Sequence, residues 1–156
     1  IETRGDTRTL VHLKQFPLET SYASVIGYVK LLCDGWHSVH KIMVDKTGVG
    51  DYIVEDMKNV GIPNVEGIIL TAQTKSEILS HLKQLMQTAR ISIPYDPDLI
   101  SEINNERYDL SKHGQILFTH PEGTHDDKLW ALALAAYATR GPPPIAVTSA
   151  KRVLSL

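Results

Sequence analysis

The chain has 156 residues, 42% of them hydrophobic, so it is long enough to bury one sizeable core. Its 16 basic and 18 acidic residues give a net charge of -2, which excludes a protein that grips nucleic acid through a strongly basic surface alone. The single cysteine, Cys33, excludes an internal disulfide framework. The longest apolar stretch, residues 129–138, is too short to cross a bilayer, so we expect a soluble, intracellular protein without membrane contact.

The first half of the chain alternates between strand-like and helix-like patterns, as α/β folds do. We expect the strand at 39–45 to be central and buried on both faces, because it is short and mostly apolar. In the segment 47–61, the glycines at its start predict a turn before the second helix, and Gly61 predicts where that helix ends. In chain order the predicted elements are a strand at 8–16, a helix at 21–35, a strand at 39–45, a helix at 47–61, a strand at 65–72 and a helix at 74–90.

The second half is less regular. Two prolines predict an irregular segment at 91–99, followed by a short helix at 99–107 and a β-hairpin at 107–120 with Gly114 in its turn. The last helix is predicted at 124–138, with Thr124 as its N-cap and alanines that let it pack closely against the sheet. The sequence GPPP then stops this helix. We therefore expect one domain at 1–140 and a tail at 141–156 that serves as a linker or binds a partner.

Three aspartates stand out by their places in this pattern. Asp45 ends the predicted central strand, at the edge where open α/β sheets build their sites, although an aspartate there can equally cap the next turn. Asp126 and Asp127 begin the last helix, where acids also interact favourably with the helix dipole. If that helix starts at the same edge as Asp45, three carboxylates meet, and a cation would relieve their repulsion. Such oxygen ligands favour magnesium or manganese, and two ions can activate a water for phosphodiester hydrolysis.

Helical phase alone does not decide which of the two adjacent acids binds metal, because both faces of the last helix are apolar. We favour Asp127 as the main ligand and keep Asp126 as a second ligand or an outer group. For His125 we expect an exposed position in the first turn, and an accessory role in moving a proton is the alternative.

These motifs resemble the nuclease domain of viral large terminases, the packaging enzymes of tailed phages and herpesviruses. The resemblance rests on VDKTGVG after a strand, then ILTAQTKSEIL, then ISIP, then GTHDDKLWALALA before a proline stop, and it covers about residues 10–137. It implies a ribonuclease H-like fold: a mixed central sheet flanked by helices, here with an added hairpin before the last helix. It also implies a metal-dependent endonuclease that cuts concatemeric double-stranded viral DNA, in the cytoplasm of a host cell.

Carried over by motif, Asp45 is the second acid of that family's metal site, and Asp126 with Asp127 is the third. Lys75 matches the lysine of the family's T-x-K-x-E stretch, where an ordinary solvated position is the preferred interpretation. The hairpin and nearby lysines are candidates for phosphate contacts. The candidate DNA-binding residues are Lys46, Lys75, Lys112 and Lys128. The implied partners are double-stranded DNA and an ATPase motor domain, or the packaging portal or small subunit.

The chain departs from the family at its start. Ribonuclease H-like folds begin with a strand that carries the first acid, and this chain starts with what looks like the second or third strand. Glu2 and Asp6 are the acids ahead of the first predicted strand, and we expect both to lie in a turn or tail. The first strand is therefore expected to be absent from this chain. No G-x-x-x-x-G-K-[ST] motif occurs, so the chain is expected to be at most the nuclease half.

Three alternatives stay open. The first is a ribonuclease H-like interaction module impaired by the loss of the first acid. The second is a related junction-resolving nuclease, which would show the same acids. The third, a nucleotide-binding α/β protein that uses TGVGD as a phosphate loop, is weaker because two glycines before a helix are common at ordinary turns.

Overall fold

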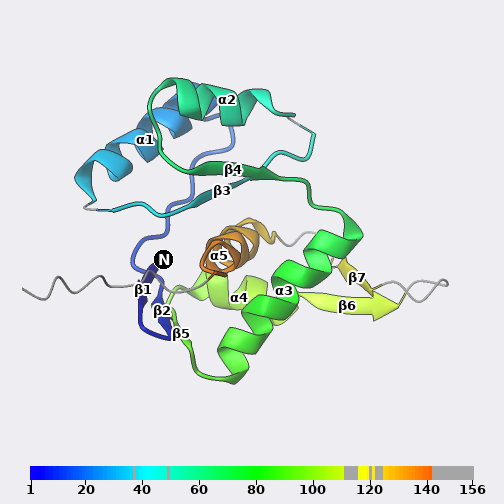
Figure 1. Cartoon of the computed structure of the whole chain (residues 1–156). Coiled ribbons are helices and arrows are strands. Elements are labelled where there is room, and N and C mark those ends of the chain that lie inside the picture. Colours follow the sequence, from blue (N-terminus) through cyan, green and yellow to red (C-terminus); the bar gives the residue numbers. More distant parts are fainter. Residues whose placement is uncertain (37, 49, 111–115, 120, 122–124, 142–156) are drawn as a thin grey trace, which may run out of the picture.

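The computed structural model describes residues 1–141 except 37, 49, 111–115, 120 and 122–124 (Figure 1). Within these residues it is a mixed α/β protein. The elements in chain order are β1 (Glu2–Arg4), β2 (Thr7–Thr9), α1 (Tyr22–Gly35), β3 (Ile42–Asp45), α2 (Tyr52–Asn59), β4 (Val65–Ile68), α3 (Ala72–Gln87), β5 (Ile91–Ser92), α4 (Pro97–Asn105), β6 (Arg107–Leu110), β7 (Ile116–Thr119) and α5 (Asp127–Ala138). No helix in the described part of the chain is long and apolar enough to cross a membrane.

The strands of the described residues form three small sheets. In the first, β2 lies between β1, which is antiparallel to it, and β5, which is parallel. The second is the parallel pair β3 and β4, with Asp45 opposite Ile68. The third is the antiparallel hairpin of β6 and β7. The parallel pair β3 and β4 arises because α2 connects the two strands as a crossover.

The pair β3 and β4 is covered on both faces (Figure 1). Helices α1 and α2 lie on one face, and α5 packs against β3 on the other. Alternate side chains of β3 enter the two sides, because side chains of a strand point in turn to opposite faces. Ile42 and Val44 pack towards α1 and α2, whereas Met43 packs towards α5. The predicted burial of this strand on both faces is thus confirmed, although its side chains are only half-buried.

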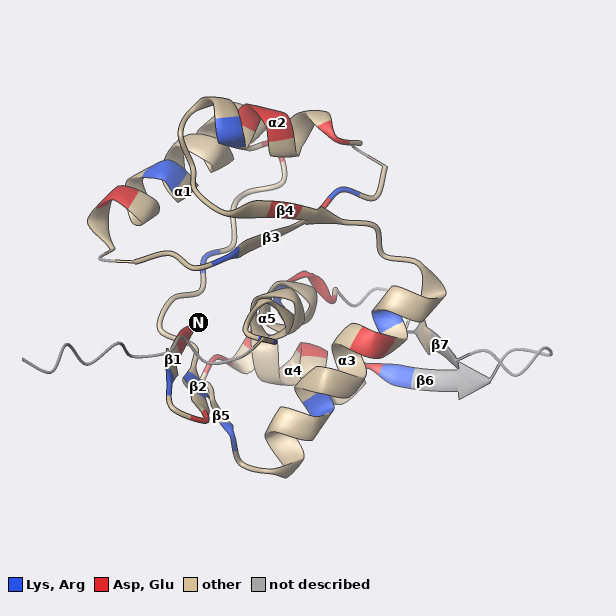
Figure 2. Ribbon diagram, viewed as in Figure 1, with Lys and Arg blue, Asp and Glu red and all other residues tan. Residues whose placement is uncertain are grey.

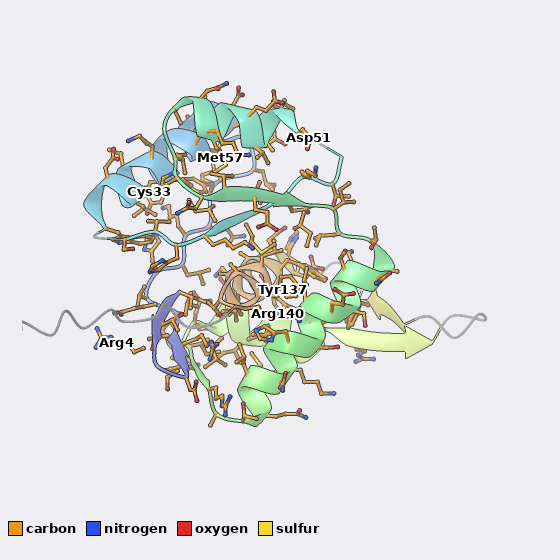
Figure 3. The ribbon with its side chains drawn as sticks, in the orientation of Figure 1. Arg4, Cys33, Asp51, Met57, Tyr137 and Arg140 are labelled. Atoms are coloured by element: carbon orange, nitrogen blue, oxygen red, sulfur yellow. The ribbon has the colours of Figure 1, made fainter. Side chains whose placement is uncertain are left out.

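Two hydrophobic clusters correspond to these two sides. The larger one joins α3, α4 and α5, and its most deeply buried side chains are Ile78, Leu99 and Leu132. The smaller one lies between the β3–β4 pair and helices α1 and α2. In Figure 3, Met57 of α2 and Cys33 of α1 mark this smaller cluster. The strands β3 and β4 therefore separate two cores, and α5 fills the centre of the larger one.

Short-range signals account for most of the helix ends. Ser21 caps α1 by accepting a hydrogen bond from the Ser24 N–H, and Thr71 caps α3 in the same way through the Thr74 N–H. Gly61, just after α2, has a φ of 80°, which side chains rarely adopt. The predicted helices at 21–35, 47–61 and 74–90 and the hairpin at 107–120 are confirmed in kind, with ends that differ by a few residues. Gly114 lies outside the described residues.

The start of the chain differs from the prediction. The expected strand at 8–16 is replaced by β1 and the short β2, so Glu2 lies in a strand, while Asp6 lies in the turn between the two as expected. Beyond β2 the ladder gains one more bond, from the Leu10 N–H to the Ser92 carbonyl at 2.9 Å. It stops there because Pro94 has no N–H to donate. The segment 91–99, predicted to be irregular, contains β5 and the first turn of α4.

The last helix also starts later than predicted. Helix α5 begins at Asp127, with Asp126 in the N-cap position, so the N-cap is not Thr124, which lies outside the described residues. The helix packs against α3, α4 and β3, which confirms the predicted close packing against the sheet. The tail is described only at Gly141, and residues 142–156 lie outside the described part. The single domain at 1–140 stays a prediction.

Candidate metal centre

Asp45 lies at the carboxyl end of β3, and its side chain is exposed. One of its carboxylate oxygens, Oδ1, accepts a hydrogen bond from the Thr47 N–H at 2.8 Å. This bond turns the chain immediately after the strand, which is the capping role that any aspartate at a strand end can play.

The turn after Asp45 is anchored to the end of β4. The Leu70 N–H donates to Thr47 Oγ1 at 2.8 Å, and the Lys46 N–H donates to the Ile68 carbonyl at 2.9 Å. Gly67 of β4 lets Val54 of α2 and Lys46 pack directly against the strand, because a Cβ at position 67 would lie 2.8 Å from Val54 Cγ2 and 2.9 Å from Lys46 Cδ. The position of Asp45 is therefore set by both strands of the pair, and not by its own strand alone.

The start of α5 supplies the other two acids. Asp126 is half-buried, and its Oδ2 accepts a hydrogen bond from the Trp130 indole Nε1–H at 2.9 Å. Asp127 is exposed. His125 is exposed as expected, but it precedes the helix and so does not lie in its first turn. Asp126 is thus held against its own helix, whereas Asp127 presents its carboxylate to solvent.

A buried carboxylate from α4 holds the first turn of α5. Glu102 is 8% exposed, and its Oε2 accepts a hydrogen bond from the Leu129 N–H at 2.8 Å. Burial raises the pKa of Glu102, and hydrogen bonds from the backbone N–H groups of Leu129 and Lys128 act against this increase. Glu102 therefore caps α5 from another helix.

Lys128 makes the return contact from α5 to the start of α4. Its Nζ lies 3.0 Å from Asp96 Oδ1 and 3.0 Å from Asp98 Oδ2. These two carboxylates raise the pKa of Lys128. The pKa of Asp96 is lowered, first by the Leu99 N–H that it caps and then by Lys128. The ammonium group is thus held by two acids of α4.

The candidate DNA-binding lysines have different outcomes. Lys128 is 8% exposed and paired with two carboxylates, an environment that does not favour a DNA contact. Lys46 is half-buried and forms an ion pair with Asp51. Lys75, for which we preferred an ordinary solvated position, is half-buried, and its Nζ lies 5.2 Å from the centroid of the Trp130 ring. Lys112 lies outside the described residues.

The donor chemistry fits a hard divalent cation, because the candidate ligands are carboxylates. Helix α5 packs against β3, and Figure 2 shows acidic residues both at the end of the β3–β4 layer and at the start of α5, on the same side of the view. Among the described residues, no group of three or more His, Cys, Asp or Glu side chains is arranged to hold an ion. Magnesium commonly takes only one or two protein carboxylates and completes its shell with water and substrate phosphate. Two aspartates from β3 and α5 are compatible with that mode.

Sequence reasoning missed Glu102 and Asp96. The signal for Glu102 was available: it lies three residues after Leu99 and one before Ile103, on the apolar face of α4, where a charged residue indicates a paired group. The signal for Asp96 was the following Pro97, because an aspartate before proline is typical of a helix start. Both lay in segments predicted only as irregular or short.

Comparison with known proteins shows what the chain is similar to. It is 28% identical over 131 residues to the terminase large subunit of Thermus virus P23-45, a match that covers 83% of this chain and 26% of that protein. The chain thus spans about a quarter of the length of the curated relatives that it matches. No profile of a known protein family matches it.

Solved structures agree with the sequence comparison. The large terminase nuclease from thermophilic phage G20c superimposes with a TM-score of 0.67 at 26% identity, over 77% of this chain and 63% of that one. The same nuclease with bound magnesium gives a TM-score of 0.66 at 27% identity, over 76% of this chain and 62% of that one. The expected fold class, α/β and ribonuclease H-like, is confirmed by this similarity, although the strands of the described residues form separate sheets.

Proposed function

We propose that the chain is the nuclease domain of a terminase large subunit. Its similarity to large terminase nucleases in both sequence and fold supports this proposal. It cuts concatemeric double-stranded viral DNA during genome packaging, in a reaction that depends on magnesium or manganese, with two ions at the site. The packing of α5 against β3 is the observation that supports this proposal most, because it joins two acid-bearing segments that lie about half the chain apart.

Asp45 and Asp127 are the proposed metal ligands, and Asp126 is the outer group. Asp127 is preferred over Asp126 because it is exposed, whereas Asp126 accepts the Trp130 indole N–H. A divalent ion held by these residues would supply Lewis-acid stabilisation of charge on the phosphodiester. The protein holds the proposed ligands in place: the Thr47 N–H fixes one oxygen of Asp45, and the capped first turn of α5 fixes the backbone of Asp127.

The DNA contacts are proposed for the lysines around this edge. Lys75 is held over Trp130, next to the start of α5, and so carries a positive charge at a fixed place. Lys46 follows Asp45, and Lys112 comes in the sequence between β6 and β7, outside the described residues. Positive side chains at these places would position phosphates without reading sequence. The remaining partners are an ATPase motor domain and a portal or small subunit, and the host cytoplasm is the proposed location.

One observation favours a second candidate function. The absence of a three-ligand cluster among the described residues fits a ribonuclease H-like module that binds metal weakly and serves in assembly rather than in cutting. The two candidate functions differ in one measurable property. A nuclease domain binds metal and then cleaves DNA, whereas an assembly module binds metal without cleaving DNA.

The test is a plasmid-cleavage assay with manganese, combined with a manganese titration. We expect the chain to bind manganese and nick plasmid DNA, and Asp45→Asn and Asp127→Asn to abolish both. The matched control is Asp34→Asn, because Asp34 is an exposed aspartate on α1, on the far side of the β3–β4 pair. Binding without cleavage would support the assembly module, and unchanged cleavage by both variants would overturn the proposed site.

A further inference from the structure

The first turn of α5 is capped in an unusual way. The initial N–H groups of a helix have no partner within the helix and need an acceptor from elsewhere. Asp126 occupies the N-cap position, yet its side chain makes no cap hydrogen bond. Its Oδ2 instead accepts the Trp130 indole N–H. The acceptor comes from α4, where the buried Glu102 takes the Leu129 N–H at 2.8 Å.

Helix α5 in turn reaches back to α4 through one side chain. The Nζ of Lys128 lies 3.0 Å from Asp96, the N-cap of α4, and 3.0 Å from Asp98 in its first turn. Each helix therefore holds the start of the other. Lys128 and Glu102 are each 8% exposed, so the bond from the Leu129 N–H to Glu102 is shielded from competing water, whereas the two acids that hold Lys128 stay partly open to solvent.

Asp127 lies in the middle of these contacts. Asp126, before it, is tied to Trp130, and Lys128, after it, is tied to α4. The Leu129 N–H, two residues on, is held by Glu102. The backbone on both sides of Asp127 is thus fixed by side chains, while its own carboxylate is exposed. The backbone from which this carboxylate projects is therefore held in part by α4.

We infer that Glu102 is a positioning residue for the metal ligand Asp127: by capping α5 it fixes the carboxylate of Asp127 towards the ion. This inference rests on the proposed function. Replacing a group that orients a metal ligand lowers metal affinity about 10- to 100-fold, so the effect is large enough to measure. A purely structural role for Glu102 would lower the melting temperature and leave the affinity for metal unchanged.

The experiment titrates the whole chain with manganese alone and follows binding by calorimetry, at a temperature where every variant is folded. We expect Glu102→Ala to weaken manganese binding about 10- to 100-fold. Glu102→Gln keeps an oxygen acceptor for the Leu129 N–H, and we expect it to restore most of the affinity. The control is Met57→Ala, which destabilises the smaller core from α2, on the side of the β3–β4 pair opposite α4 and α5, and should leave the position of Asp127 and manganese binding unchanged.

The outcomes separate this inference from the proposed function. If Asp127→Asn weakens binding and Glu102→Ala weakens it no more than Met57→Ala does, Glu102 is only structural and the inference is overturned while the metal site stands. If the unmodified chain binds no manganese, or if Asp45→Asn and Asp127→Asn bind as it does, the proposed function falls and the inference falls with it. Weakening by Glu102→Ala with recovery in Glu102→Gln supports the inference.

Discussion

Replacing Leu132 by alanine tests whether α5 is the centre of the larger core. Leu132 is 1% exposed and belongs to the cluster formed with α3 and α4. The change removes three carbon atoms, worth about 2.4 kcal/mol at about 0.8 kcal/mol each. The unfilled cavity adds to this, so the expected loss of unfolding free energy is about 3 to 4 kcal/mol. For a chain of this length that corresponds to a fall in melting temperature of roughly 6 to 16 °C.

The assay is urea unfolding followed by circular dichroism, together with thermal melting. The matched control is Leu31→Ala, the same chemical change within α1 at a side chain that is 71% exposed. We expect it to alter the unfolding free energy by less than about 0.5 kcal/mol. If Leu31→Ala costs as much as Leu132→Ala, or if Leu132→Ala costs less than about 1 kcal/mol, burial of α5 is not what stabilises this core.

Three further predictions follow from the structure. The lowered pKa of Asp96 contributes stability that is present above its unfolded pKa and is lost as the pH falls through the folded one; Asp96→Asn should therefore lower the melting temperature at pH 7 and reduce its dependence on pH below about 4. Gly67→Ala should destabilise by about 1 to 3 kcal/mol in urea unfolding, because the new Cβ would lie 2.8 Å from Val54 Cγ2. Thr47→Val should cost about 1 kcal/mol in the same assay, because the Leu70 N–H loses its acceptor, and should weaken manganese binding by displacing Asp45.

Each of these predictions has a result that contradicts it. An acid transition that Asp96→Asn leaves unchanged would show that this carboxylate is not differently protonated on folding. A Gly67→Ala protein as stable as the parent would mean that Val54 moves aside at no cost. A Thr47→Ser variant keeps the hydroxyl acceptor and serves as the control for Thr47→Val. If Thr47→Val and Thr47→Ser bind manganese with equal affinity, the turn at Thr47 does not influence metal binding.

The fold was largely predictable where its signals are local. Helix α1 follows from apolar spacing and from Ser21 as the N-cap, and the hairpin of β6 and β7 from the pattern around its turn. The strand predicted at 8–16 was too long because the length of β2 depends on its partner. That partner ends before Pro94, far along the chain, and no local pattern at residues 8–16 reports it.

The sequence by itself determined where the acids stand in the chain, and from these places it predicts the candidate metal ligands: Asp45 after a strand, and Asp126 and Asp127 at the start of an apolar helix. These follow from chain order and from the chemistry of carboxylates. Only the tertiary structure decided that the buried Lys128 pairs with Asp96 and that Glu102 caps α5. The physical reason is that a charged side chain of an isolated segment is solvated by water. It forms an ion pair or caps a helix only when another helix brings a partner group next to it and displaces water.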